Sequence, residues 1–469
     1  MDYKGCLLFN PYQLNQKPKK SSKNFLTMTP KTDITSRKIS FEILHAILNQ
    51  GSLAHELFTA QSAWGKLPAR DRAFVRVLVM SCIRQYGQLT ICIDSFVKRP
   101  PKPRIRTIIL LGAAQLLILK TEPHAAIHTS VSLVRALVGD AYTGLVNGVL
   151  RTISRSGEKL FQATNPSDNL PEFFKKDWSK NWGEFAVQQI MQLAQSQAPL
   201  DITLKVMSNT DIDFIPDWTE NLSAKLLSSH SVRCNPVADV TQLPGYYEGQ
   251  WWVQDCTAAL PARLMGNVSD KNIIDLCAAP GGKTAQLVSA GAHVTAIDHN
   301  ASRINRLSDN LNRLSLKANI ICADGRDYIP EDPVDGVLLD APCSSTGTIR
   351  RRPDVLIGKT PTQIKQLQSL QIELGLAAAK WIKSGGTLIY ATCSLQKQEG
   401  EEVLEALISN EKSGLILDPI RREEADILYP SKRVEDTIDY LRILPNQLLT
   451  NGTDNRGNDG FFIARLKVK

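Results

Sequence analysis

The sequence predicts an α/β protein: a Rossmann-like, doubly wound parallel sheet in the carboxy-terminal half, preceded by an all-helical domain and a small α+β connector. Two patterns support this prediction. Apolar residues recur with a helical period from Ile34 to about Ser154. After residue 270, short apolar segments that end in polar or glycine-rich turns alternate with helix-like segments, which is typical of the strands and helices of a parallel sheet.

The chain divides into four expected regions: a disordered segment 1–33, the all-helical domain 34–157, the connector 158–250 and the α/β domain 251–469. The first segment is polar and lysine-rich, so it has too little apolar surface to offset the entropy of ordering. Met28 stands just before the helical pattern, and the sequence is compatible with a translation start at Met1 or at Met28. The connector combines a helix-like segment at 185–195 with a strand-like segment at 201–207.

Apolar patterning and cysteine usage indicate a cytoplasmic protein. The longest apolar stretch, residues 108–119, falls well short of the roughly 20 residues that span a bilayer, so we expect a buried helix and no membrane contact. The amino-terminal residues lack the apolar core of a secretory signal. The nine cysteines include no C-x-x-C pair, so we expect neither a disulfide framework nor a metal site. We expect the chain to act as a monomer.

Positive charge is concentrated at the front of the chain. Residues 1–110 hold 18 Lys and Arg against 6 Asp and Glu, and the remainder holds 37 against 41. This asymmetry favours a polyanion-binding domain joined to a domain that does chemistry, because neutralising phosphates gives affinity without sequence specificity. The segment 97–106, which has five basic and no acidic residues, is a candidate phosphate contact. The alternative is that the lysine-rich amino-terminal tail and the segment 97–106 are simply exposed to solvent and bind no polyanion.

The first strand of the α/β domain ends in "DLCAAPGGKT", residues 275–284. This segment is not a P-loop, because Cys277 occupies the position where that motif requires a glycine. A strand, a turn of small residues and a helix start still allow a ligand to approach backbone N–H groups closely. Asp298 ends the next strand, where a ribose-binding carboxylate is expected. The small-residue turn and Asp298 together indicate a binding site for a nucleoside cofactor. The alternative is that both features are purely structural, a tight turn and an acid that caps a helix.

Two cysteines follow two later strands. In an open α/β sheet the ligand lies beyond the carboxyl ends of the strands, near the switch in strand order. If strands 273–276 and 337–340 flank that switch, strand 388–391 lies beside the latter. Cys343 and Cys393 then project from adjacent strand ends into one pocket.

The motifs Pro342-Cys343 and Thr392-Cys393 resemble the two cysteine motifs of the RNA cytosine-5 methyltransferases, a family that uses S-adenosylmethionine. The segments "RDRAFVRVLVMSCIRQYG", "EPHAAIHTSV" and "GLVNGVLRTI" resemble the NusB-like amino-terminal domain of the branch that acts on small-subunit ribosomal RNA. The resemblance covers about residues 35–469. It departs from the common pattern at His299 and Arg352, neither of which affects the expected reaction.

The resemblance implies a class I S-adenosylmethionine-dependent methyltransferase that methylates carbon 5 of a cytosine in 16S ribosomal RNA before the subunit is fully assembled. Cys393 is then the nucleophile, Cys343 assists product release, and Asp340 contacts the cytosine edge. The implied cofactor-binding residues are Cys277, Ala278, Ala279, Pro280, Gly281, Gly282, Lys283, Asp298, Asp324 and Asp340. Arg350, Arg351 and Arg352 either hold phosphates that flank the target or form a solvated run of charge.

Two alternatives stay open. The same chemistry could act on tRNA or on another ribosomal RNA site, and the NusB-like segments are the only argument for the small subunit. The chain could instead be an inactive RNA-binding assembly or antitermination factor, although the intact cysteine motifs argue against it.

Overall fold

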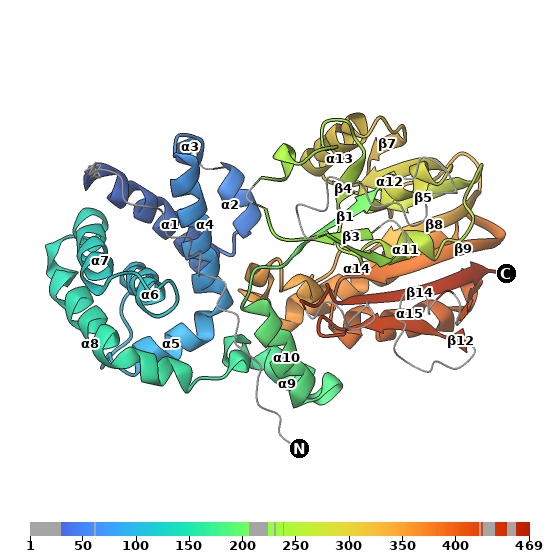
Figure 1. The fold of residues 1–469 in the computed structure, drawn as a ribbon. Helices are drawn as coiled ribbons and strands as arrows, with labels where there is room; N and C mark the ends of the chain where they lie inside the picture. The colour runs from blue at the N-terminus through green and yellow to red at the C-terminus, as the bar shows by residue number, and fades with distance from the viewer. Residues whose placement is uncertain are drawn as a thin grey trace, which may run out of the picture.

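The computed structural model describes residues 30–60, 62–205, 224–228, 231–237, 239–421, 424, 437–447 and 456–469. A helical domain lies on one side and an α/β domain on the other, with the connector between and below them (Figure 1). Residues 1–29 of the segment expected to be disordered, including Met1 and Met28, lie outside the described residues, and residues 30–33 begin the first helix.

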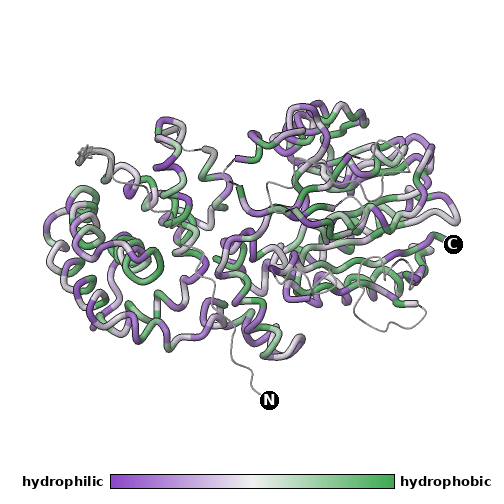
Figure 2. Tube along the Cα trace, viewed as in Figure 1, coloured by the Kyte–Doolittle hydropathy of each residue, from purple (hydrophilic) through white to green (hydrophobic). Residues whose placement is uncertain are grey.

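Helices form the whole of the front domain. They are α1 (Pro30–Gln50), α2 (Ala54–Ala60), α3 (Ser62–Gly65), α4 (Ala69–Arg84), α5 (Tyr86–Asp94), α6 (Pro103–Leu117), α7 (Pro123–Leu137) and α8 (Thr143–Gln162). Pro103 starts α6, where a missing N–H is harmless, and every residue from 107 to 117 is buried, as the apolar run predicts. Hydrophobic and hydrophilic residues alternate along the surrounding helices (Figure 2). No described helix is long and apolar enough to span a bilayer.

Two basic side chains of the segment 97–106 make contacts within this domain. Arg106 pairs with Asp94 at 2.6 Å, and Arg104 lies over the ring of Phe41. Lys98 and Arg99 remain exposed. Contact between these two residues and RNA stays a prediction.

The connector contains α9 (Glu172–Trp182), α10 (Glu184–Ala194) and a sheet of order β2-β3-β1-β4. Its strands are β1 (Leu200–Leu204), β2 (Lys225–Ser228), β3 (Ser231–Cys234) and β4 (Trp251–Val253). Helix α8 runs past residue 157, and β4 pairs with β1 from beyond residue 250. Elements of the structure thus extend across both expected boundaries, at residues 157 and 250, and these two boundaries stay predictions.

The α/β domain is built on a sheet whose order is β10-β14-β9-β8-β5-β6-β7, with β13 beside β14. The parallel strands are β5 (Asn272–Leu276), β6 (His293–Asp298), β7 (Asn319–Cys322), β8 (Val334–Asp340) and β9 (Ile382–Thr392). The strands β10 (Leu415–Leu417), β13 (Tyr440–Ile443) and β14 (Phe461–Val468) add an antiparallel edge, and β11 (Ile420–Arg421) pairs separately with β12 (Thr437–Ile438). The predicted Rossmann-like class is confirmed, and so is the predicted placement of β8 between β5 and β9.

Helices cover both faces of this sheet (Figure 1). They are α11 (Leu260–Arg263), α12 (Gly282–Ser289), α13 (Ala301–Arg313), α14 (Pro361–Ala379) and α15 (Glu401–Ser409). The central strands are buried on both faces, as their continuous apolar sequences require.

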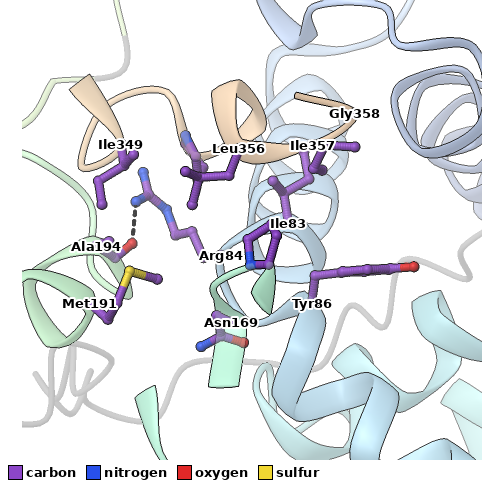
Figure 3. A pocket seen from close by; sticks show the side chains of 12 residues that line it. Ile83, Arg84, Tyr86, Asn169, Met191, Ala194, Ile349, Leu356, Ile357 and Gly358 are labelled. Carbon is purple, nitrogen blue, oxygen red and sulfur yellow. Dashed lines mark hydrogen bonds between the residues drawn. The ribbon is translucent and has the colours of Figure 1, made fainter. Parts of the chain in front are cut away.

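The helical domain packs directly against the α/β domain. Arg84 of α4 donates to the carbonyl oxygens of Ala194 at 2.6 Å and Arg350 at 2.8 Å, and Figure 3 shows it reaching Ala194 beside a small cavity of about 150 Å³. The backbone N–H of Ala54 in α2 donates to the buried carboxylate of Asp354 at 3.0 Å. These contacts fix α2 at the edge of the α/β domain.

Candidate active site

The two cysteines predicted to share a pocket lie side by side. Strands β8 and β9 are paired in register as far as Asp340 and Ala391, so both chains leave the sheet at the same level. The Sγ atoms of Cys343 and Cys393 are 3.5 Å apart, and both residues are half-buried. The arrangement brings two thiols, from segments 50 residues apart, to one point.

A close approach of backbones holds the Cys343 loop against the end of β9. The N–H of Gly347 donates to the carbonyl oxygen of Cys393 at 2.9 Å, and the N–H of Gly460 donates to the carbonyl oxygen of Gly347 at 2.9 Å. A Cβ atom at residue 347 would overlap the Gly460 carbonyl and lie 2.9 Å from the Cys393 oxygen. Only glycine fits between them.

A buried carboxylate ties the two cysteine segments together. Glu399 accepts hydrogen bonds from the backbone N–H of Ser344 at 2.8 Å, the hydroxyl of Ser394 at 2.6 Å and the amide of Gln371 at 3.1 Å, and also from the Ser344 hydroxyl. Ser344 and Ser394 each directly follow a cysteine. Sequence reasoning did not identify Glu399, because a glutamate in "QKQEGEE" carries no signal that it is buried.

The hydrogen bond between the thiols makes them chemically unequal. The bond from the Cys343 thiol lowers the pKa of Cys393, against the effect of burial. The same bond, together with burial, raises the pKa of Cys343 well above the ordinary thiol value. Lys283 and Arg351 also lie within electrostatic range of Cys393. Cys393 is therefore the thiol that more readily forms the nucleophilic thiolate.

Lys283 belongs to the predicted cofactor turn but reaches the cysteine end of the site. Its ammonium group lies 2.8 Å from Asp340 Oδ2, and the Asp340 side chain is 31% exposed. The exposed part of this carboxylate leaves it able to accept a hydrogen bond from a ligand.

The three arginines after Cys343 have different environments, which corrects the expectation that all three either hold phosphates or are solvated. Arg350 is buried and pairs with Asp255 at 2.8 Å. Arg351 pairs with the buried Asp459. Only the Arg352 side chain has no ion pair or hydrogen bond with any residue the structure describes, and its Nε atom is buried without a partner. Burial of Arg350 and Asp459 requires ion-pair partners, so the charge of Arg350 lies inside the protein, and the charge of the partly exposed Arg351 is already paired with Asp459.

The cofactor turn between β5 and α12 has a backbone that its sequence dictates. Gly281 has φ = +98°, which favours glycine, and a Cβ atom there would lie 3.1 Å from Leu307 Cγ of α13. Cys277 also has a positive φ of 62°. The turn therefore presents main-chain groups rather than long side chains to the space above β5.

Three acids lie near the cofactor turn, and they differ in accessibility. Asp275 is buried and accepts from Thr284 Oγ1 at 2.5 Å, its Oδ1 atom has no partner among the described residues, and burial raises its pKa to about 7. Asp298 accepts from the backbone N–H of Ala279 and lies 3.3 Å from Arg303. Asp324 is bound by Arg326, and that hydrogen bond lowers its pKa to about 2. Of the three, only Asp275 lines the central cavity.

One cavity of about 1090 Å³ joins the two halves of the site. The predicted site residues that line it are Cys277, Ala278, Ala279, Pro280, Gly281, Gly282, Lys283, Asp340, Cys343 and Cys393. Asp298 and Asp324 lie outside its lining. Part of α2, including His55, forms another wall, which the sequence did not predict.

Comparison with known proteins gives two family matches. The family described as 16S rRNA methyltransferase RsmB/F matches residues 262–467, and the NusB family matches residues 34–155. Ribosomal RNA small subunit methyltransferase B of Cronobacter sakazakii is 32% identical over 402 residues, covering 81% of this chain and 91% of that protein. The protein of the same name from Escherichia coli O17:K52:H18 is 33% identical over 397 residues, covering 79% and 89%.

Solved structures show the same fold. The crystal structure of PH0851 matches with a TM-score of 0.70 and 20% identity, covering 94% of this chain and 99% of that one. A methyltransferase homologue from Pyrococcus horikoshii matches with a TM-score of 0.50 and 24% identity, covering 64% and 95%.

Proposed function

The chain belongs to the RsmB/F family of 16S rRNA methyltransferases, and we propose that it methylates carbon 5 of a cytosine in small-subunit ribosomal RNA through a covalent adduct on Cys393. The main support is the pair of thiols 3.5 Å apart at the ends of β8 and β9. Their opposite pKa shifts give one the character of a nucleophile and the other that of a proton holder.

S-adenosylmethionine fits the half of the cavity above β5. The turn 277–283 offers main-chain groups at close range. When bound, S-adenosylmethionine supplies an electrophilic methyl group. We assign cofactor binding to residues 277–283 with Asp340. We also assign it to Asp298, the last residue of β6, and to Asp324, which follows β7, because both accept hydrogen bonds from backbone N–H groups of neighbouring loops.

Covalent addition explains the need for a thiolate. Carbon 5 of cytosine is a weak nucleophile until an atom adds at carbon 6, and a thiolate is well suited to that addition. The Cys393 thiolate forms the S–C6 bond, and carbon 5 then becomes nucleophilic. The exposed carboxylate of Asp340, fixed by Lys283, is able to accept a hydrogen bond from the exocyclic amino group of the base.

Release reverses the addition. After carbon 5 has gained its methyl group, a base takes the remaining proton from carbon 5, the C5–C6 double bond reforms, and the S–C6 bond breaks to return the thiolate. Cys343, whose sulfur atom lies 3.5 Å from that of Cys393, assists this stage.

Ribosomal RNA is the substrate favoured by the NusB match and by the names of the relatives. A cytosine inside a helix cannot reach Cys393, so the target is unpaired or flipped out, which favours RNA that is not yet fully assembled into the subunit. We propose a monomeric, cytoplasmic enzyme. The alternative of the same chemistry on tRNA has no comparable support, and the intact thiol pair argues against an inactive assembly factor.

Two single substitutions test the mechanism. Cys393→Ala should abolish both methyl transfer and any covalent RNA adduct. Cys343→Ala should permit attack but slow release, so that methylated RNA stays attached to the protein through denaturing electrophoresis. An adduct that forms in Cys393→Ala instead would reverse the roles, and full activity in both variants would refute the covalent mechanism. Transcripts of 16S rRNA and tRNA, compared side by side, identify the substrate class.

A further inference from the structure

Three cations that line the cavity have no ion-pair or hydrogen-bond partner among the residues that the structure describes. They are Arg306 of α13, Arg352 after the Cys343 loop, and Lys359 just before α14. None of their side chains makes an ion pair or hydrogen bond with any residue in the described part of the chain, and Arg352 Nε is buried without a partner. The other arginines and lysine of the cavity wall differ, because Lys283, Arg303, Arg313 and Arg351 are bound to carboxylates or carbonyl oxygens.

The helical domain faces these cations across the cavity. His55 lies on α2, and α2 is held in place by the bond from the Ala54 N–H to Asp354. Burial, followed by the charges of Arg352 and Arg306, lowers the pKa of His55, whereas Glu56 and Asp354 raise it. Arg306 and Arg352 are therefore both close to His55, although α2, the Cys343 loop and α13 are distant in sequence.

These cations line the same cavity as Cys343 and Cys393. Arg352 directly follows Arg351, whose guanidinium is within electrostatic range of the Cys393 sulfur. An RNA strand that delivers a base to Cys393 carries a phosphate on each side of that base, so its backbone must cross the same opening. Unpartnered cations at this opening match the phosphates in charge and in position.

We propose that Arg306, Arg352 and Lys359, together with His55 of the helical domain, form a shared phosphate-binding site for the RNA strand next to the target cytosine. This inference rests on the proposed function for its ligand. The carboxylate of the cofactor is a poorer match, because one carboxylate cannot satisfy cations from three separate segments. The site makes the helical domain a wall of the active site and not only a remote RNA anchor.

The test uses the full-length protein and a short oligouridylate, which has the phosphate backbone but no cytosine. Arg306→Gln, Arg352→Gln and Lys359→Gln should each weaken oligouridylate binding about threefold to tenfold. Each should also reduce the slope of log affinity against log salt by about 0.7, because one phosphate is no longer neutralised. His55→Ala should weaken binding less. Lys380→Gln is the matched control, because Lys380 is exposed just before β9, at the end of that strand opposite to Cys393.

Calorimetry with S-adenosylmethionine separates the two possible ligands, and its affinity should be unchanged in all variants. Unchanged oligouridylate slopes in the three cation variants, or a loss of cofactor affinity in place of RNA affinity, would overturn the proposal. Because oligouridylate cannot be methylated, a drop in its binding supports the phosphate site even if the wild-type protein proves inactive on cytosine. The proposed chemistry and the phosphate site can therefore fail independently.

Discussion

The two halves of the cavity are built in different ways. Above β5 and β6, the wall is a turn of small residues whose main chain faces the ligand, and the acids around it mostly brace the backbone. Beyond β8 and β9, the groups proposed to react are side chains, and the residues next to them are held by partners from distant segments, such as Glu399 and Asp459.

This difference follows from what each half must do. A cofactor that is held by main-chain groups needs a backbone of fixed shape, which glycine and small residues provide. A covalent step needs two sulfur atoms held within a fraction of an ångström, because misplacement by about 1 Å can reduce a rate about 100-fold. Substitutions beyond β8 and β9 should therefore reduce turnover, whereas substitutions above β5 and β6 should reduce cofactor affinity.

The largest effect on activity is expected for Glu399→Gln. The substitution keeps the shape of the side chain but replaces one acceptor oxygen by a donor, which faces the hydroxyls of Ser344 and Ser394. We expect kcat to fall about 100-fold, with cofactor affinity within about twofold of wild type. Glu405→Gln, an exposed charge change on α15, is the control. Equal losses of kcat and cofactor affinity would mean that the two halves are not independent.

An effect on stability rather than on turnover is expected for Asp275→Asn, through the pH dependence of unfolding. Burial raises the Asp275 pKa from 3.8 to about 7, so the unfolded chain ionises at lower pH than the folded one. The stability that the protonated group contributes is complete below about pH 4 and is lost as the pH rises to 7. The variant should therefore gain about 4 kcal/mol relative to wild type between those pH values, measured by denaturant unfolding. A difference that does not change with pH would contradict a buried, protonated Asp275.

Gly281→Val should reduce cofactor affinity about tenfold, the smallest of the three effects. The side chain is strained at φ = +98° and meets Leu307, so the turn must shift. Gly139→Val is the control, because Gly139 has φ = +112° but lies in open space in the helical domain. Both variants should lose stability, and calorimetry should show weaker S-adenosylmethionine binding only for Gly281→Val. Weaker binding in both variants would indicate global destabilisation instead.

The strand ends on which the site is built could be predicted from the amino-acid sequence. Alternating apolar segments and glycine-rich turns predicted the five parallel strands and the neighbours of β8, because strand and helix periods are local properties of the chain. Those strand ends brought Cys343 and Cys393 together as predicted. The turn at 277–283 was recognisable for the same local reason.

Which charged side chains are available to a ligand depends on contacts between distant parts of the folded chain. Arg350, Arg351 and Arg352 look alike in the sequence, yet Arg350 pairs with a carboxylate 95 residues away and Arg351 with one 108 residues away. The wall formed by α2 and the buried position of Glu399 likewise depend on contacts between distant segments. Local patterns do not encode such pairs, because the free energy of burying a charge depends on which partner the folded chain brings to it.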